Sequence, residues 1–483
     1  MRKALLQYST TACDFALQFL TIWYVTRLFD TEGWGLWSLG ASISVVLYSA
    51  TFVFDQFQVR HISNIWDEGD RKSAMWLQFR TSTIRAVNFI ALFLFLLRFG
   101  PVIISALDLP KAVINLAIAN LLTMAAYGME LPWSSPGLRA LGLMGWRQVL
   151  LVGRLCCRIS VFLWIDFANL TIANAAFAVA AIECGYTIIT LLGSLFYFWR
   201  LPGKPKKIPI HFHEVLNLSL TQFFANIYNG GLGIVAGSIL PLHELGMFNY
   251  ARTMMSAANA TVAAQVILVY RETLLKLKFQ HRLEECRRRI TGTSWLFVTA
   301  SLTYILWAPA VLETLSLNAG EKFHTWLYVL AFSVIVYIRF SVNRERFVRY
   351  TIDDTRGPMR VMSIRIVSEL SALLALTTTL TDRNVWVIFL VLWMFSGGHL
   401  FWLIYLSRRT PIKMTKRNGI VEFVAYFVLL LFAGTAAYLS INLIPDFRIL
   451  LYGGLVLGAV SATVHVWTAT RLIRYIDGKA GIA

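Results

Sequence analysis

Residues 384–406 read NVWVIFLVLWMFSGGHLFWLIYL, a run without a single Asp, Glu, Lys or Arg. A run of this length crosses the hydrocarbon core of a bilayer as an α-helix. Similar apolar runs, separated by short polar gaps, recur along the whole chain of 483 residues. Only 14% of the residues are charged, against about 25% in soluble domains, and the mean hydropathy is +0.61. We therefore expect an all-α polytopic membrane protein.

The apolar runs predict fourteen transmembrane helices. Their expected ranges are 11–28, 34–54, 86–107, 112–130, 149–168, 171–198, 213–239, 244–269, 293–312, 323–342, 361–380, 384–406, 420–442 and 449–470. Alternate connections hold 33 Lys and Arg on one side of the membrane and four on the other. Because connections rich in Lys and Arg stay in the cytoplasm, both termini are expected there. The same distribution accounts for the net charge of +18, so no nucleic-acid partner is expected.

An internal repeat relates two parts of the chain. Glu32–Gly40 and His243–Ala251 share a short outer turn, a glycine and an aromatic residue two positions on, at a constant offset of 211. A duplication of this kind predicts two parallel six-helix lobes related by a pseudo-two-fold axis along the membrane normal, plus two extra C-terminal helices. The expected divisions are an N-lobe over 1–200, a cytoplasmic linker over 201–212, a C-lobe over 213–406 and additional helices over 407–483. In the last of these, the spacing of Gly454 and Gly458 indicates helix packing.

Several motifs resemble those of the bacterial polysaccharide and oligosaccharide flippases of the multidrug, oligosaccharidyl-lipid and polysaccharide exporter superfamily. They are Arg27 at the end of the first helix, the Asp30–Gly40 turn, the loop from Gln58 to Arg71 and the Arg139–Gly142 connection. The resemblance implies a two-lobed transporter of the bacterial inner membrane that carries a lipid-linked oligosaccharide from the inner to the outer leaflet. It also implies contact with membrane lipids and with glycosyltransferases or a polymerase of a polysaccharide pathway. The glycine- and arginine-rich opening signature of the lipid II flippases is missing here, which argues against a cell-wall precursor.

Two arginines stand out within the predicted spans, where a charged side chain requires a partner, a cavity or a route to the surface. Arg154 and Arg158 lie one turn apart on one face of the helix over 149–168. A pair of guanidinium groups can hold phosphate oxygens bidentately, as in a pyrophosphate that links lipid to sugar. The alternative is pairing with an acidic residue of the same or a neighbouring helix, for which the sequence offers Glu130, Asp166 and Glu183.

Polar residues of other predicted helices indicate the walls of the same cavity. Arg252 lies on a stripe with Asn249, whereas Arg98 suits either the cavity or the outer interface. Stripes on the first helix of each lobe would donate hydrogen bonds to sugar hydroxyls, although polar contacts between helices would leave the same pattern. The predicted substrate-binding residues are Arg98, Arg154, Arg158, Arg252, Gln18, Gln222, Asn226, Asn229 and Asn249.

Two carboxylates are candidates for coupling transport to H+ or Na+. Asp14 lies deep in the first predicted helix, and Glu183 lies on a polar face with Tyr186, Thr187 and Thr190. A carboxylate within the membrane can exchange protons with the solvent. A structural hydrogen bond or ion pair is the alternative for Asp14.

The sequence offers no metal-ligand spacing among its five cysteines and no nucleophile with a base, so neither an enzyme nor a resident cofactor or metal is expected. Besides the flippase, two functions remain open. One is a multidrug or cation exporter of the same superfamily, which should have an acidic cavity. The other is a membrane subunit of a polysaccharide synthase that carries out no transport of its own.

Overall fold

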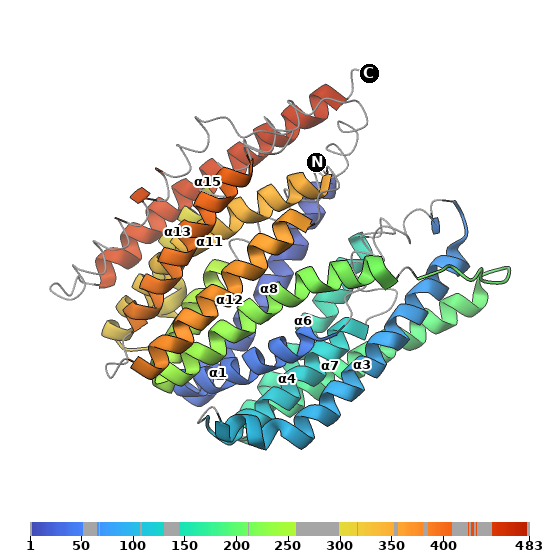
Figure 1. Ribbon diagram of the computed structural model, residues 1–483, viewed down its shortest axis with the longest axis horizontal. Helices are drawn as coiled ribbons and strands as arrows, with labels where there is room; N and C mark the ends of the chain where they lie inside the picture. Colours follow the sequence, from blue (N-terminus) through green and yellow to red (C-terminus); the bar gives the residue numbers. More distant parts are fainter. Residues whose placement is uncertain are drawn as a thin grey trace. The chain divides into compact units, whose positions relative to one another are not determined.

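The regular structure of the described residues is helical throughout (Figure 1). The computed structural model describes residues 2–51, 65–66, 68–106, 109–129, 144–210, 212–256, 299–315, 317–351, 356–379, 385–407 and 447–480, together with a few single positions between 424 and 431. The span predicted over 420–442 falls almost wholly outside this part of the chain. Within it, the all-α class predicted from the sequence is confirmed.

The chain forms two compact units, one of residues 12–242 and one of residues 1–11 with 243–483. The helices of the first are α1 (Arg2–Ser49) from residue 12 on, α3 (Arg71–Ala106), α4 (Ala112–Met129), α6 (Met144–Ala168), α7 (Ile172–Arg200) and α8 (Phe212–Ile239). The second contains helices over residues 242–256 and 299–313, and α11 (Ala319–Thr351), α12 (Arg356–Thr379), α13 (Val385–Ser407) and α15 (Phe447–Ala480). The lobe boundaries expected from the repeat stay a prediction.

Two stretches of the described residues are long and apolar enough by themselves to cross a membrane, Arg71–Ile103 and Ile172–Arg200. Shorter apolar segments lie within α4, α12, α13 and α15. The outer faces of α3 and α7 carry exposed large apolar side chains, among them Leu94, Val102, Ile189 and Leu192. Such faces suit contact with lipid tails.

A sharp break divides α1 where the sequence predicts a turn between two spans. Asp30 has φ 59°, in the left-handed region, and its Oδ1 accepts a hydrogen bond of 2.9 Å from the Gly33 N–H. This is N-cap geometry, because the carboxylate satisfies a donor that a helix start leaves without an intrahelical acceptor. Residue 241, which lies at the repeat offset of 211 from Asp30, directly precedes the helix over 242–256. The two equivalent helices therefore begin at equivalent positions.

Glycines let the second half of α1 approach α4 and α8 closely. A Cβ atom at Gly40 would lie 2.6 Å from Cβ of Leu116 on α4, and one at Gly230 on α8 would overlap the carbonyl oxygen of Ser42. Ser44, one turn after Gly40, donates a hydrogen bond of 2.6 Å to the carbonyl oxygen of Ala117. Backbone contact of this kind is the usual way in which helices associate within a bilayer.

The helix α3 begins fifteen residues before the predicted span 86–107, so that boundary was wrong. Asp70 caps the helix, since its Oδ1 accepts a hydrogen bond of 3.1 Å from the Ser73 N–H. The first turns bury Ala74 and Leu77 against Val215 of α8. An apolar run reports only the part of a helix inside the bilayer, whereas capping and packing extend this helix beyond it.

In the second unit, α15 packs on the helix over 299–313. Cβ atoms at Gly454 and Gly458 would overlap Leu306 and Trp307, respectively, which confirms the packing that their spacing indicates. Further along the same face, His465 Nδ1 lies 2.9 Å from Thr299 Oγ1. Thus α15 contacts the helix over 299–313 through small and polar residues, Gly454, Gly458 and His465, which we call the α15 seam.

Candidate functional site

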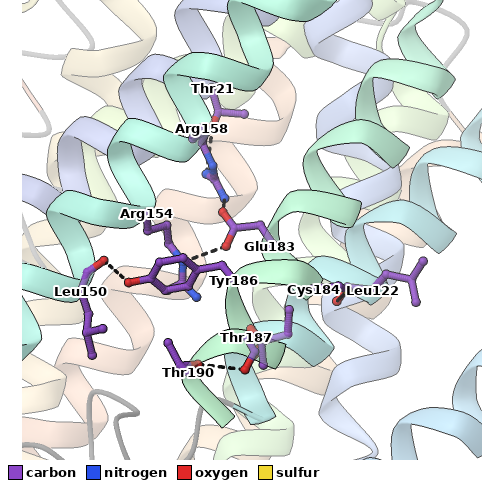
Figure 2. A network of polar contacts seen from close by, with 11 residues as sticks. Thr21, Leu122, Leu150, Arg154, Arg158, Glu183, Cys184, Tyr186, Thr187 and Thr190 are labelled. Atoms are coloured by element: carbon purple, nitrogen blue, oxygen red, sulfur yellow. Dashed lines mark hydrogen bonds and ion pairs between the residues drawn. The ribbon is translucent and has the colours of Figure 1, made fainter. Parts of the chain in front are cut away.

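Two guanidinium groups of α6 converge on one carboxylate of α7 (Figure 2). Arg154 Nε lies 2.7 Å from Glu183 Oε2, with the two side chains 4% and 2% exposed. Arg158 Nη2 contacts the other oxygen of the same carboxylate, Oε1, and its side chain is 8% exposed. We call Arg154, Arg158 and Glu183 the arginine–glutamate triad. The pairing of both arginines with Glu183, one of the alternatives that the sequence allows, is therefore present.

The triad forms because residues four apart on α6 share the face that packs on α7. Tyr186, one turn after Glu183, places its ring 5.1 Å from Cζ of Arg154. Its hydroxyl donates a hydrogen bond of 2.6 Å to the carbonyl oxygen of Leu150. The aromatic ring thus contributes a cation–π contact and also ties α7 to α6.

Hydrogen bonds to α4 fix the rotation of α7 about its axis. Thr187 Oγ1 donates to the carbonyl oxygen of Ala126 at 3.1 Å, and Cys184 Sγ lies 3.9 Å from the carbonyl oxygen of Leu122. Because these residues follow Glu183 directly and one turn later, they hold its carboxylate toward α6 while α4 covers the adjacent face.

The first helix also reaches the triad. Arg158 Nη1 donates a hydrogen bond of 3.1 Å to Thr21 Oγ1 (Figure 2). One turn further along α1, Tyr24 stacks on Phe162 of α6 with ring centroids 4.8 Å apart. The polar stripe predicted on this helix therefore faces α6 at Thr21. The side chains of Asp14 and Gln18 on the same stripe lie outside the described part, as does that of Gln222.

The remaining predicted residues have different surroundings. In the second unit, Asn249 is buried and its Oδ1 accepts a hydrogen bond of 3.5 Å from Arg252 Nη1. On α8, Asn226 is buried whereas Asn229, one turn on, is exposed. Arg98 is exposed next to Leu97 and Phe99, which are exposed as well. These surroundings suit the outer-interface alternative for Arg98, and its binding role stays a prediction.

The sequence places Tyr186 on one helix face with Glu183, but its contact with Arg154 was not predicted. The missing information was which helix lies opposite, since the contact with Arg154 requires α6 to pack on α7 in this register.

The triad resembles an anion-binding site in which the bound anion is a side chain of the protein, the Glu183 carboxylate. Each of two buried guanidinium groups directs one nitrogen at a common point, and a carboxylate occupies it. A phosphate or pyrophosphate has oxygens in number and geometry to accept from the same donors. Such contacts are strong in a buried site because water screens them little.

No protein-family model matches the sequence, and no curated protein matches it. Solved structures do match. The inward-facing conformation of a multidrug resistance MATE family transporter of the MOP superfamily is 13% identical over 89% of this chain and 95% of that chain, with a TM-score of 0.53. The outward-facing conformation of a multidrug resistance MATE family transporter of the same superfamily is 13% identical over 90% and 95%, with a TM-score of 0.52. The chain therefore has the fold of MOP superfamily transporters, that of multi-pass membrane proteins.

Proposed function

We propose that this protein is a flippase that moves a lipid-linked oligosaccharide, joined through polyprenyl pyrophosphate, from the inner to the outer leaflet. The observation that carries the proposal is the convergence of Arg154 and Arg158 on a single buried point of the first unit. Paired arginines recognise phosphate oxygens by charge and geometry together. The fold of a transporter and the motifs near the first turn support the same reading.

In this proposal Glu183 is an internal substitute for the cargo. Its single carboxylate pairs with both guanidinium groups when no cargo is bound and offsets one of their two charges, and the pyrophosphate displaces it. A displaced carboxylate in the interior then has to reach another partner, since an isolated buried charge is costly. Asp14 and Glu183 stay the proposed residues for coupling transport to H+ or Na+.

The remaining polar residues are proposed to contact the glycan. Asn249 with Arg252 in the second unit, and Asn226 with Asn229 on α8, offer donors and acceptors that suit sugar hydroxyls. Gln18, Gln222 and Arg98 are proposed for the same role. The distribution of Lys and Arg supports an inner-membrane protein with both termini in the cytoplasm, where glycosyltransferases or a polymerase would supply the cargo.

A multidrug exporter is the second candidate, and the similarity to two structures of multidrug resistance MATE family transporters favours it. Cationic drugs require an acidic site, whereas the triad holds two arginines for one glutamate. The two candidates therefore differ in the charge of the cargo.

The test is a flipping assay in proteoliposomes with a fluorescent glycan on a short polyprenyl pyrophosphate, compared with a fluorescent lipophilic cation. We expect flipping of the glycolipid and loss of it in the triple variant Arg154→Met, Arg158→Met, Glu183→Leu. The matched control is Glu313→Gln with Lys322→Met, which removes an ion pair of 2.9 Å in the second unit and should leave flipping intact. Transport of the cation alone, or normal flipping by the triple variant, would rule the proposal out.

A further inference from the structure

The connection between α7 and α8 lies along the start of α3. Lys72 Nζ donates a hydrogen bond of 2.7 Å to the carbonyl oxygen of Leu201, and the N–H of Lys206 donates one of 2.8 Å to Ser73 Oγ. Further on, Arg80 Nη1 donates one of 2.8 Å to the carbonyl oxygen of Ile208. The segment expected to be a simple linker is therefore held at three points along its length.

Apolar packing against α3 and α8 also holds this segment in place. Ile208 and Ile210 pack against a buried cluster formed by Ala74 and Leu77 of α3 and Val215 of α8. These contacts join the linker to α3 and α8. The backbone that carries the lysines of the linker is therefore held in place by these hydrogen bonds and apolar contacts.

This fixed segment lies where two apolar helices end. The apolar stretch Ile172–Arg200 finishes at the residue before the linker, and Arg71–Ile103 begins beside it. At this level Trp199 is 79% exposed and Phe196 is 60% exposed, and the Arg200 guanidinium carbon lies 4.1 Å from the centroid of the Phe196 ring. Exposed aromatic residues next to basic ones at the ends of apolar helices are typical of the headgroup region of a bilayer.

The charge of this surface is strongly positive. Residues 65–80 and 196–210 contain seven Lys and Arg against three Asp and Glu. Lys204, Lys206 and Lys207 are exposed. Lys206 Nζ lies 3.6 Å from Asp70, with its side chain 81% exposed, and so exposed a pair is weak. Hydrogen bonds from Ser73, with a smaller contribution from Lys206, hold the pKa of the Asp70 carboxyl below its usual range, so the cap of α3 stays ionised while the three lysines face outward.

We propose that Lys204, Lys206 and Lys207, held on this linker, form a binding surface for the phosphate groups of acidic phospholipids in the adjoining leaflet. The exposed Trp199 and Phe196 sit among the upper acyl chains and glycerol groups, and the lysines reach the phosphates above them. This arrangement favours a lipid over a soluble anion, because a soluble anion gains nothing from the aromatic residues. The surface is separate from the arginine–glutamate triad and does not depend on the nature of the cargo.

The test uses the full-length protein in detergent, titrated with phosphatidylglycerol or phosphatidylcholine, with bound lipids counted by native mass spectrometry. We expect preference for phosphatidylglycerol, and a loss of roughly 10- to 100-fold in its affinity when Lys204, Lys206 and Lys207 are all changed to Gln. The matched control changes Arg408, Arg409 and Lys413 to Gln, which removes the same charge from another connection expected on the same side. It should retain the preference.

A second variant tests the fixed geometry rather than the charge. Ser73→Ala removes the acceptor for the Lys206 N–H and leaves every lysine in place, so we expect a several-fold loss of phosphatidylglycerol affinity without a change in net charge. Equal loss in the Arg408, Arg409 and Lys413 control would show that charge alone matters and would overturn the proposal. So would full binding by the triple lysine variant, or binding of an acidic soluble peptide as strong as that of the lipid.

Discussion

Replacing Glu183 with Gln separates the structural role of the arginine–glutamate triad from its role in binding. The substitution preserves the shape of the side chain but leaves Arg154 and Arg158 facing an amide, with all three positions at most 8% exposed in their side chains. Removing one partner of a buried ion pair costs about 3 to 5 kcal/mol, because the remaining charge is left without compensation. For a unit of this size that corresponds to a fall in Tm of roughly 6 to 20 °C.

The assay is thermal unfolding of the purified protein followed by tryptophan fluorescence, with and without inorganic pyrophosphate. In Glu183→Gln the anion no longer competes with an internal carboxylate, so pyrophosphate should bind more tightly than in the unchanged protein. At a concentration of about 100 times Kd it would restore roughly 2.7 kcal/mol.

The triple variant Arg154→Met, Arg158→Met, Glu183→Leu completes the comparison. Apolar replacement of a whole buried ion group is often neutral or stabilising, so this variant should unfold at or above the temperature of the unchanged protein and gain nothing from pyrophosphate. A Glu183→Gln protein as stable as the unchanged one would refute the structural reasoning. A destabilised Glu183→Gln protein that pyrophosphate fails to stabilise would refute the anion-site reasoning alone.

Two further predictions concern the close approach of helices. Gly40→Ala places a methyl group against Leu116 and should lower the free energy of unfolding by about 1 to 3 kcal/mol; Gly185→Ala, where the added Cβ meets no atom within 4 Å, is the matched control and should be neutral or slightly stabilising. Equal effects of the two substitutions in thermal unfolding would contradict the packing of α1 on α4. Gly458→Leu should detach α15, because its side chain would overlap Trp307, and limited proteolysis should then remove the C-terminal segment faster. At Gly453 on the same helix an added Cβ meets no atom within 4 Å, so the Gly453→Leu protein should be cleaved at the unchanged rate. Equally faster proteolysis of both variants would contradict the packing of α15 on the helix over 299–313.

The broad architecture was predictable because each helix that crosses a bilayer needs an apolar run of about 20 residues. Apolar runs located α4, α6, α7 and α13 to within a few residues, and the repeat offset of 211 relates the break at Asp30 to the start of the helix after residue 241. Hydropathy says nothing about a helix once it leaves the membrane. The early start of α3 therefore depended on a cap at Asp70 and on packing against α8, neither of which an apolar run reports.

The triad shows where sequence reasoning stops. The spacing of Arg154 and Arg158 predicts a shared face, but three acidic residues were equally good partners on the sequence alone. Asp166 proves to be exposed, and Glu130 lies outside the described residues. Glu183 is selected by the rotation of α7, which the hydrogen bonds of Thr187 and Cys184 to α4 determine. A choice of that kind depends on how three helices pack, and no local pattern on any one of them contains it.

Stability alone gives little reason to place two arginines and one glutamate in the interior of this unit. A buried ion group costs desolvation energy that its internal attraction barely recovers, and apolar side chains of similar volume would serve the packing of α6 on α7 at least as well. Recognition is different, because no apolar side chain holds a phosphate. Sharing one carboxylate between two guanidinium groups offsets one of their two charges and directs a nitrogen of each toward a single point. Exchange of that carboxylate for an anionic cargo is therefore a function that the triad can perform and that an apolar interior cannot.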